Sequence, residues 1–210
     1  MPTVSIMIPT NKPDVNALIN DLLKTEYEKL LISASCLQQS AAKNRNWCID
    51  NCHSDIIVMV DDDVEVMEGD WLTKLLAPLI KYRDQISVIA PRLHSPQKQP
   101  CAQLGNNGWH DIIETGLKCA CHTPETKLNI TTSACIAFFK EDGVRFNEKY
   151  PDACFEDSDF CMRYKKKFPN KKIVINEHSK LIHHNRGSWR SGKTWEYNRQ
   201  LFFEEWGIRI

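Results

Sequence analysis

The sequence predicts an α/β protein with a mixed, mainly parallel sheet flanked by helices in a single domain. Short apolar runs alternate with helical patterns through the first half of the chain, as is typical of parallel strands joined by crossover helices. With 210 residues, the chain is long enough for one sizeable core. No clear linker interrupts it, so we expect one domain over residues 1–210.

The elements of the first half follow this alternation. We expect strands over Val4–Ile8, Leu30–Ala34, Ile56–Val60 and Ile86–Ala90, and helices after Asp14, over Ser40–Cys52 and over Asp70–Tyr82. The strands are continuous apolar runs, which indicates burial on both faces of the sheet. Asp14 is suited to cap the first helix, because its carboxylate can accept a free backbone N–H.

The second half is less regular. We expect a strand within Thr132–Phe139, a helix over Asp157–Phe168, a short strand over Lys172–Ile175 and a final helix from Trp195. The segment His94–Thr126 lacks a clear period and is expected to be mostly loop.

Composition limits the possible partners and the compartment. Lys plus Arg and Asp plus Glu each total 27, so no overall field favours nucleic acid. No window approaches the roughly 20 apolar residues that a transmembrane helix needs, and no basic segment begins a secretory signal. We therefore expect a cytoplasmic protein whose nine cysteines are reduced. The cysteines and histidine at 101, 119, 121 and 122 lack the paired spacing of structural zinc sites.

Three consecutive aspartates, Asp61, Asp62 and Asp63, follow the third predicted strand. Ligands of open α/β sheets bind beyond the carboxyl ends of the strands, and carboxylates placed there can hold Mg²⁺ or Mn²⁺ against a diphosphate. The alternative is a solvated acidic loop, which is common in proteins.

A second acidic cluster contains Glu156, Asp157 and Asp159 at the start of a predicted helix. Its carboxylates can simply complement the helix dipole. Alternatively, one of them can point into a cleft and act as a general base for a hydroxyl nucleophile.

Two adjacent histidines, His183 and His184, are followed by Arg186. A neutral imidazole can complete a metal shell, and the guanidinium fork suits phosphate. Trp109, Trp189 and Trp195 can act as platforms for sugar rings, although ordinary core or loop packing is the more common role of such residues.

Taken in order, these motifs resemble the GT-A-fold (Rossmann-like) glycosyltransferases of the family-2 type, over nearly the whole chain. The resemblance is carried by Val4–Thr10, Ala41–Asn46 with Arg45, the D-x-D element Asp61–Asp63, Ile89–Leu93 with Gln103–Gly105, Ser133–Cys135, Phe146–Glu148, Glu156–Arg163 and His183.

The resemblance implies a metal-dependent transfer of a sugar, such as the hexose glucose or the deoxyhexose rhamnose, from a UDP-linked donor to a hydroxyl of a glycan or glycoprotein, with inversion. Residues 1–93 would bind the nucleotide sugar and residues 94–210 the acceptor. The implied site comprises Asp157 as base; Pro9, Thr10, Lys43, Arg45, Asp61, Asp62 and Arg186 on the donor; Asp61, Asp63, His183 and His184 on Mn²⁺ or Mg²⁺; and Glu156, Asp159, Trp109 and Trp189 on the acceptor side.

One departure concerns the nucleotide base. The family usually carries an acidic residue after its second strand, whereas Ser33–Cys36 occupies that place here. Two other functions remain alternatives. A nucleotidyltransferase would normally bring a glycine-rich phosphate loop, but Pro9–Pro13 contains no glycine. A non-catalytic nucleotide-sugar or carbohydrate binding module would bind without turnover.

Overall fold

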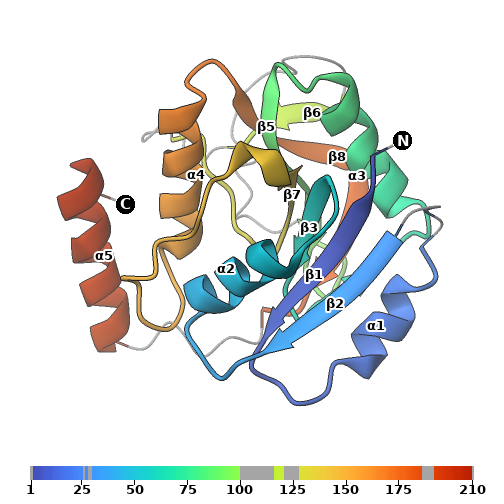
Figure 1. The fold of residues 1–210 in the computed structure, drawn as a ribbon, viewed down its shortest axis with the longest axis horizontal. Helices are drawn as coiled ribbons and strands as arrows, with labels where there is room; N and C mark the ends of the chain where they lie inside the picture. The colour runs from blue at the N-terminus through green and yellow to red at the C-terminus, as the bar shows by residue number, and fades with distance from the viewer. Residues whose placement is uncertain are drawn as a thin grey trace.

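The computed structural model describes residues 2–25, 27, 30–99, 116–120, 128–185 and 192–209. Within these residues, one sheet contains eight strands in the order β2-β1-β3-β7-β5-β8-β4, and β6 pairs with β8 (Figure 1). The strands are β1 Val4–Thr10, β2 Leu30–Cys36, β3 Ile56–Val60, β4 Val64–Val66, β5 Ile86–His94, β6 Leu117–Cys119, β7 Cys135–Phe139 and β8 Lys172–His183.

The helices follow the predicted pattern closely. They are α1 Asn16–Leu22, α2 Ala41–Asn51, α3 Trp71–Lys81, α4 Glu156–Lys167 and α5 Gly192–Trp206, with a 3-10 turn at Lys140–Asp142. Ser40 caps α2, because its side chain accepts the backbone N–H of Lys43. The expected cap of α1 is displaced by one residue: Val15 is the N-cap, and Asp14 accepts the N–H of Asn16 from outside the helix.

The central strands are covered on both faces, as their apolar runs predict. Every residue of β3 and of β5 is buried, and successive side chains of a strand point to opposite faces of the sheet. Helix α2 packs on β1 and β2, whereas α3 packs on β5, β7 and β8. The single main core therefore lies between the sheet and these helices.

The sheet is mixed. Strands β1, β2, β3, β5 and β8 run in one direction, while β7, β4 and β6 run antiparallel to their neighbours. Strand β7 lies between β3 and β5, so these two do not pair directly. The β-α alternation of the sequence did not indicate this insertion, because β7 is not joined to the first half by a crossover helix.

Strand β8 is much longer than expected, and its second half determines where the site forms. Beside β5 its register jumps, from Pro91 opposite Asn176 to Arg92 opposite Lys180. Its last residues then pair antiparallel with β4, so that His183 lies opposite Val64. This pairing carries His183 next to the acidic triplet, which ends one residue before Val64.

Candidate active site

A cavity of about 880 Å³ opens at the carboxyl ends of β1 and β3. Pockets for small molecules commonly have volumes of about 300–1,000 Å³, and this edge is where open α/β sheets bind ligands. Its lining includes Pro9 and Thr10 from β1, the triplet Asp61–Asp63 and the start of α4. Donor-side and acceptor-side residues predicted from the sequence thus share one cavity.

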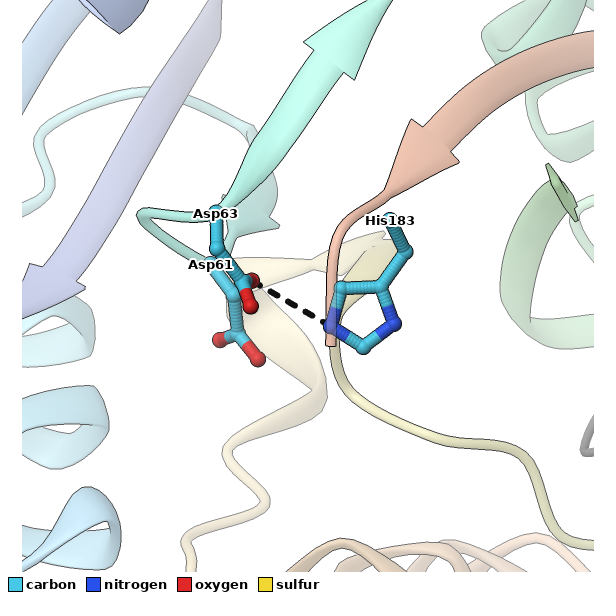
Figure 2. A group of neighbouring side chains, drawn as sticks. All are labelled: Asp61, Asp63 and His183. Carbon is cyan, nitrogen blue, oxygen red and sulfur yellow. Dashed lines mark ion pairs between the residues drawn. The ribbon is translucent and has the colours of Figure 1, made fainter. Parts of the chain in front are cut away.

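Asp61, Asp63 and His183 form a compact group of potential metal ligands at this cavity (Figure 2). One ligand atom from each lies within 4.8 Å of the others, and His183 Nε2 is 3.2 Å from Asp63 Oδ1. Two carboxylates and an imidazole suit a divalent cation such as Mn²⁺. The residues present therefore fit the metal that the sequence predicts.

The electrostatics of this group also favour a cation. Burial raises the pKa of Asp61, and the charge of Asp63 raises it further, although Arg45 and His183 oppose the shift. Burial lowers the pKa of His183, but its hydrogen bond with Asp63 and the negative charges of Asp63 and Asp61 leave the pKa raised. Burial thus acts in opposite directions on the two pKa values, whereas the negative charge of Asp63 raises both.

The β8 register separates the two adjacent histidines. Because neighbouring side chains on an extended chain point to opposite sides, His183 faces the aspartates while His184 turns to Glu65. His184 Nε2 lies 3.0 Å from Glu65 Oε2, and the group of potential metal ligands does not include it. The geometry thus favours His183 over His184 as a ligand.

Asp62 points away from its two neighbours, toward the loop that follows β1. Thr10 Oγ1 donates a hydrogen bond to one of its oxygens, and Lys12 Nζ contacts the other at 2.5 Å. Pro9, Thr10 and Lys12 all line the cavity. Lys12 was not predicted, although a lysine two residues beyond the first strand was a signal that could have been used.

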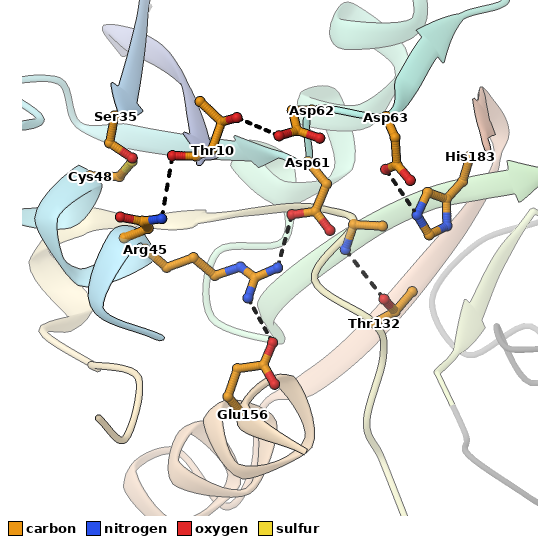
Figure 3. Close-up of polar contacts among 12 residues, drawn as sticks. Thr10, Ser35, Arg45, Cys48, Asp61, Asp62, Asp63, Thr132, Glu156 and His183 are labelled. Atoms are coloured by element: carbon orange, nitrogen blue, oxygen red, sulfur yellow. Dashed lines mark hydrogen bonds and ion pairs between the residues drawn. The ribbon is translucent and has the colours of Figure 1, made fainter. Parts of the chain in front are cut away.

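Arg45 joins the two acidic clusters (Figure 3). Its side chain is 6% exposed and donates to Glu156 Oε1 at 2.7 Å and to Asp61 Oδ1 at 2.9 Å. Burial lowers the pKa of Arg45, but the surrounding carboxylates outweigh this effect and raise it. Arg45 also lines the cavity, so its predicted role on the donor stays a prediction; in this structure its guanidinium bonds two carboxylates.

Lys43 also differs from its expected place. It is exposed on α2 and does not line the cavity. Successive residues of a helix are rotated by about 100°, so when Asn44 and Arg45 face inward, Lys43 faces solvent.

The start of α4 brings two of the predicted catalytic and acceptor-side residues to the cavity. Glu156 and Asp157 line it, and Asp157 is partly exposed, with Oδ1 accepting the N–H of Ser158 at 2.7 Å. Burial and the charge of Asp157 raise the pKa of Glu156, and Arg45 partly offsets them. A partly exposed carboxylate that faces a cavity suits a general base.

Asp159 is not part of this lining. Its carboxylate is fully buried, contacts Arg163 at 2.5 Å and accepts the indole N–H of Trp206 at 2.9 Å. The expectation of an acceptor-side role is corrected, since Asp159 instead ties α4 to α5.

Several predicted site residues lie outside the described residues, namely Arg186, Trp109 and Trp189. Trp195, for which packing was the favoured alternative, lines the cavity beside Thr194 and also packs edge-on against Phe155. The lining further includes a short polar stretch before β7, Thr131–Ser133. Sequence reasoning assigned the two threonines no role on the cavity, whereas Ser133 belongs to the Ser133–Cys135 motif that resembles the family.

None of the helices formed by the described residues combines the length and apolar character that crossing a membrane requires.

The family model of glycosyl transferase family 2 matches residues 17–142, which is more than half of the chain. The chain therefore belongs to this family, as its motifs predicted. Among curated proteins, the succinoglycan biosynthesis protein ExoM of Rhizobium meliloti (strain 1021) is 27% identical over 155 residues, covering 71% of this chain and 46% of ExoM. The chain thus spans about half the length of this relative.

Solved structures confirm the GT-A fold. GalNAc-T7, solved with UDP, GalNAc and Mn²⁺, matches with a TM-score of 0.74 at 11% identity, covering 98% of this chain and 48% of that one. TarS of S. aureus matches with a TM-score of 0.58 at 15% identity, covering 97% of this chain and 39% of TarS.

Proposed function

We propose that this chain transfers a sugar from a nucleotide diphosphate donor to an acceptor hydroxyl in a reaction that requires Mn²⁺ or Mg²⁺. The observation that carries this proposal is the convergence of Asp61, Asp63 and His183 in a cavity that Asp157 also lines. These residues would place a cation and its diphosphate beside a carboxylate able to accept a proton. The match to family 2 supports the same reaction class.

Each group has a role in this reaction. A cation held by Asp61, Asp63 and His183 would supply positive charge for the diphosphate as it leaves. Asp62, which is bonded to Thr10 and Lys12, would accept a hydrogen bond from the ribose of the donor.

Asp157 takes the proton of the acceptor hydroxyl while its oxygen attacks the anomeric carbon. The bond from that carbon to the diphosphate oxygen breaks, and its electron pair leaves with the nucleoside diphosphate. Attack from the face opposite the leaving group inverts the anomeric centre. A single displacement of this kind needs one base and no covalent intermediate.

UDP is the donor nucleotide we favour, because GalNAc-T7 was solved with UDP and Mn²⁺. The sugar, proposed as a hexose or deoxyhexose such as glucose or rhamnose, and the glycan acceptor follow from the family alone. The proposed halves also share the metal site, since His183 from residues 94–210 joins two aspartates from residues 1–93.

The test is a screen of nucleotide sugars with Mn²⁺, Mg²⁺ or EDTA, in which release of the nucleoside diphosphate and formation of the glycoside are both measured. Asp157→Asn should abolish turnover and leave binding of UDP with Mn²⁺ intact. The matched control is Asp84→Asn, because Asp84 is exposed and lies outside the cavity lining.

The same screen separates the alternatives. Undiminished turnover in Asp157→Asn contradicts the base assignment, whereas binding without turnover in the native chain indicates a binding module. A nucleotidyltransferase would instead release pyrophosphate from a nucleoside triphosphate and a sugar phosphate.

A further inference from the structure

The C-terminal helix α5 lies outside α4 at one side of the molecule (Figure 1). A small hydrophobic cluster, separate from the main core, joins it to the segment before α4. Tyr150, Phe155 and Phe202 are the buried members, and Trp195 and Trp206 pack against them. Helix α5 therefore supports the part of the chain that leads into the acceptor side of the cavity.

That segment, residues 151–155, has an unfavourable backbone conformation. Asp152, Cys154 and Phe155 have φ values of 55°, 90° and 68°, in the left-handed region that residues with a side chain avoid. Such conformations persist only where the surroundings hold them, and they gather at functional sites. Residues 152–155 all line the cavity, and the next two residues are Glu156 and Asp157.

Asn198 of α5 holds this segment. Its side chain is completely buried, and Nδ2 donates to the carbonyl oxygens of Pro151, Ala153 and Cys154 at 3.3, 3.1 and 3.0 Å. The remaining carbonyl, of Asp152, accepts the backbone N–H of Ala41 at 2.8 Å. All four carbonyls from 151 to 154 are thus bound, three of them by one amide.

We infer that Asn198 is a positioning residue, which fixes residues 151–155 and thereby orients the Asp157 carboxylate toward the donor side of the cavity. This inference rests on the proposed function, because it concerns the same reaction. The residue itself does not line the cavity. Its effect passes through the backbone to which it is bonded.

The main test is Asn198→Ala. Phe202 and Trp206 should keep α5 packed in place. The variant therefore removes the hydrogen bonds to residues 151–155 without displacing the helix. We expect kcat for sugar transfer, per folded molecule, to fall by about tenfold to a hundredfold, since misplacing a reacting group by about 1 Å can cost about a hundredfold. Binding of UDP with Mn²⁺ should be unchanged, because its ligands lie on β8 and after β3.

The matched control is Asn176→Ala. Asn176 is also buried and its Nδ2 donates to the carbonyl of Lys74 at 2.8 Å, but it lies outside the cavity lining. The Asn176→Ala variant should have a lower melting temperature and an unchanged kcat.

Two further variants keep the inference testable if Asn198→Ala does not fold. Asn198→Ser retains one donor and should give a smaller loss of kcat. Ala41→Pro removes the N–H that binds Asp152, and it is compatible with the fold because Ala41 is the first residue of α2 and Ser40 is extended.

Hydrogen exchange separates this inference from the proposed function. Peptides spanning residues 150–160 should exchange faster in Asn198→Ala than in the native chain, whether or not any donor is turned over. Full kcat in Asn198→Ala, unchanged exchange, or a loss of UDP binding that parallels the loss of kcat would overturn the positioning role. A native chain that transfers no sugar would refute the proposed function alone.

Discussion

Arg45→Met removes the guanidinium that joins Asp61 to Glu156, and the cost to stability can be worked out from the burial of these partners. The side chains of Arg45 and Glu156 are 6% and 4% exposed, whereas that of Asp61 is 26% exposed. Removing one partner of a buried ion pair costs about 3–5 kcal/mol, because an uncompensated charge stays behind. Asp61 is better solvated than Glu156, so the loss of its bond to Arg45 adds less to this cost.

We therefore expect Arg45→Met to lower the free energy of unfolding by about 3–5 kcal/mol. The assay is urea unfolding followed by circular dichroism in EDTA, so that bound metal cannot mask the loss. Adding Glu156→Leu should recover part of the stability, since the stranded carboxylate is then gone.

Arg45→Lys is the matched variant. This variant keeps the charge but loses the planar fork of donors that reaches both carboxylates. Its free energy of unfolding should lie between those of the native chain and Arg45→Met. A loss under about 1 kcal/mol for Arg45→Met, which is typical of exposed pairs, would refute the reasoning.

Three more predictions follow from the structure. Asp63→Ala should abolish the Mn²⁺-dependent binding of UDP in calorimetry, while His184→Ala should leave it; equal affinity in both variants would contradict the assigned ligand set. Ile6 is fully buried, so Ile6→Ala should lower the free energy of unfolding by about 2–5 kcal/mol. Leu31 is 60% exposed on the edge strand, so Leu31→Ala should change it by less than about 0.5 kcal/mol. Similar losses in the two variants would contradict the packing. Ser40→Ala should cost about 0.5–1 kcal/mol through the lost cap, because its hydrogen bond to Lys43 is long at 3.4 Å; no loss in thermal unfolding would argue against the cap.

The sequence predicted those elements whose signal is local. The apolar runs of β1, β3 and β5 and the helical patterns of α2 and α3 lie within the elements they define. Their positions agree with the expectation to within a few residues at each end.

Elements that depend on distant pairing were missed. Strand β4 has only three residues, and β6 has three as well, so neither has a run long enough to show a period. In β8, the polar stretch Asn176–Ser179 interrupts the apolar pattern, and the strand resumes because Leu181 and Ile182 pair with β4. Such pairing is a property of the fold rather than of the segment.

The same distinction applies to the site. The motifs that resemble the family placed Asp61, Asp63 and His183, and the structure brings these three together. The partners of Arg45 lie 16 and 111 residues away, and nothing local indicates that its guanidinium bonds two carboxylates. Asp159 was misassigned for a similar reason, since its partner Trp206 is 47 residues away.

The central claim is that two aspartates and one histidine from opposite halves of the chain hold a single divalent cation. Pulsed electron paramagnetic resonance of Mn²⁺ bound with UDP tests it directly, because a coordinated imidazole gives a nitrogen coupling. We predict one such coupling, lost in His183→Gln and retained in His184→Gln. A spectrum without nitrogen coupling, or a coupling that disappears only in His184→Gln, would contradict the account.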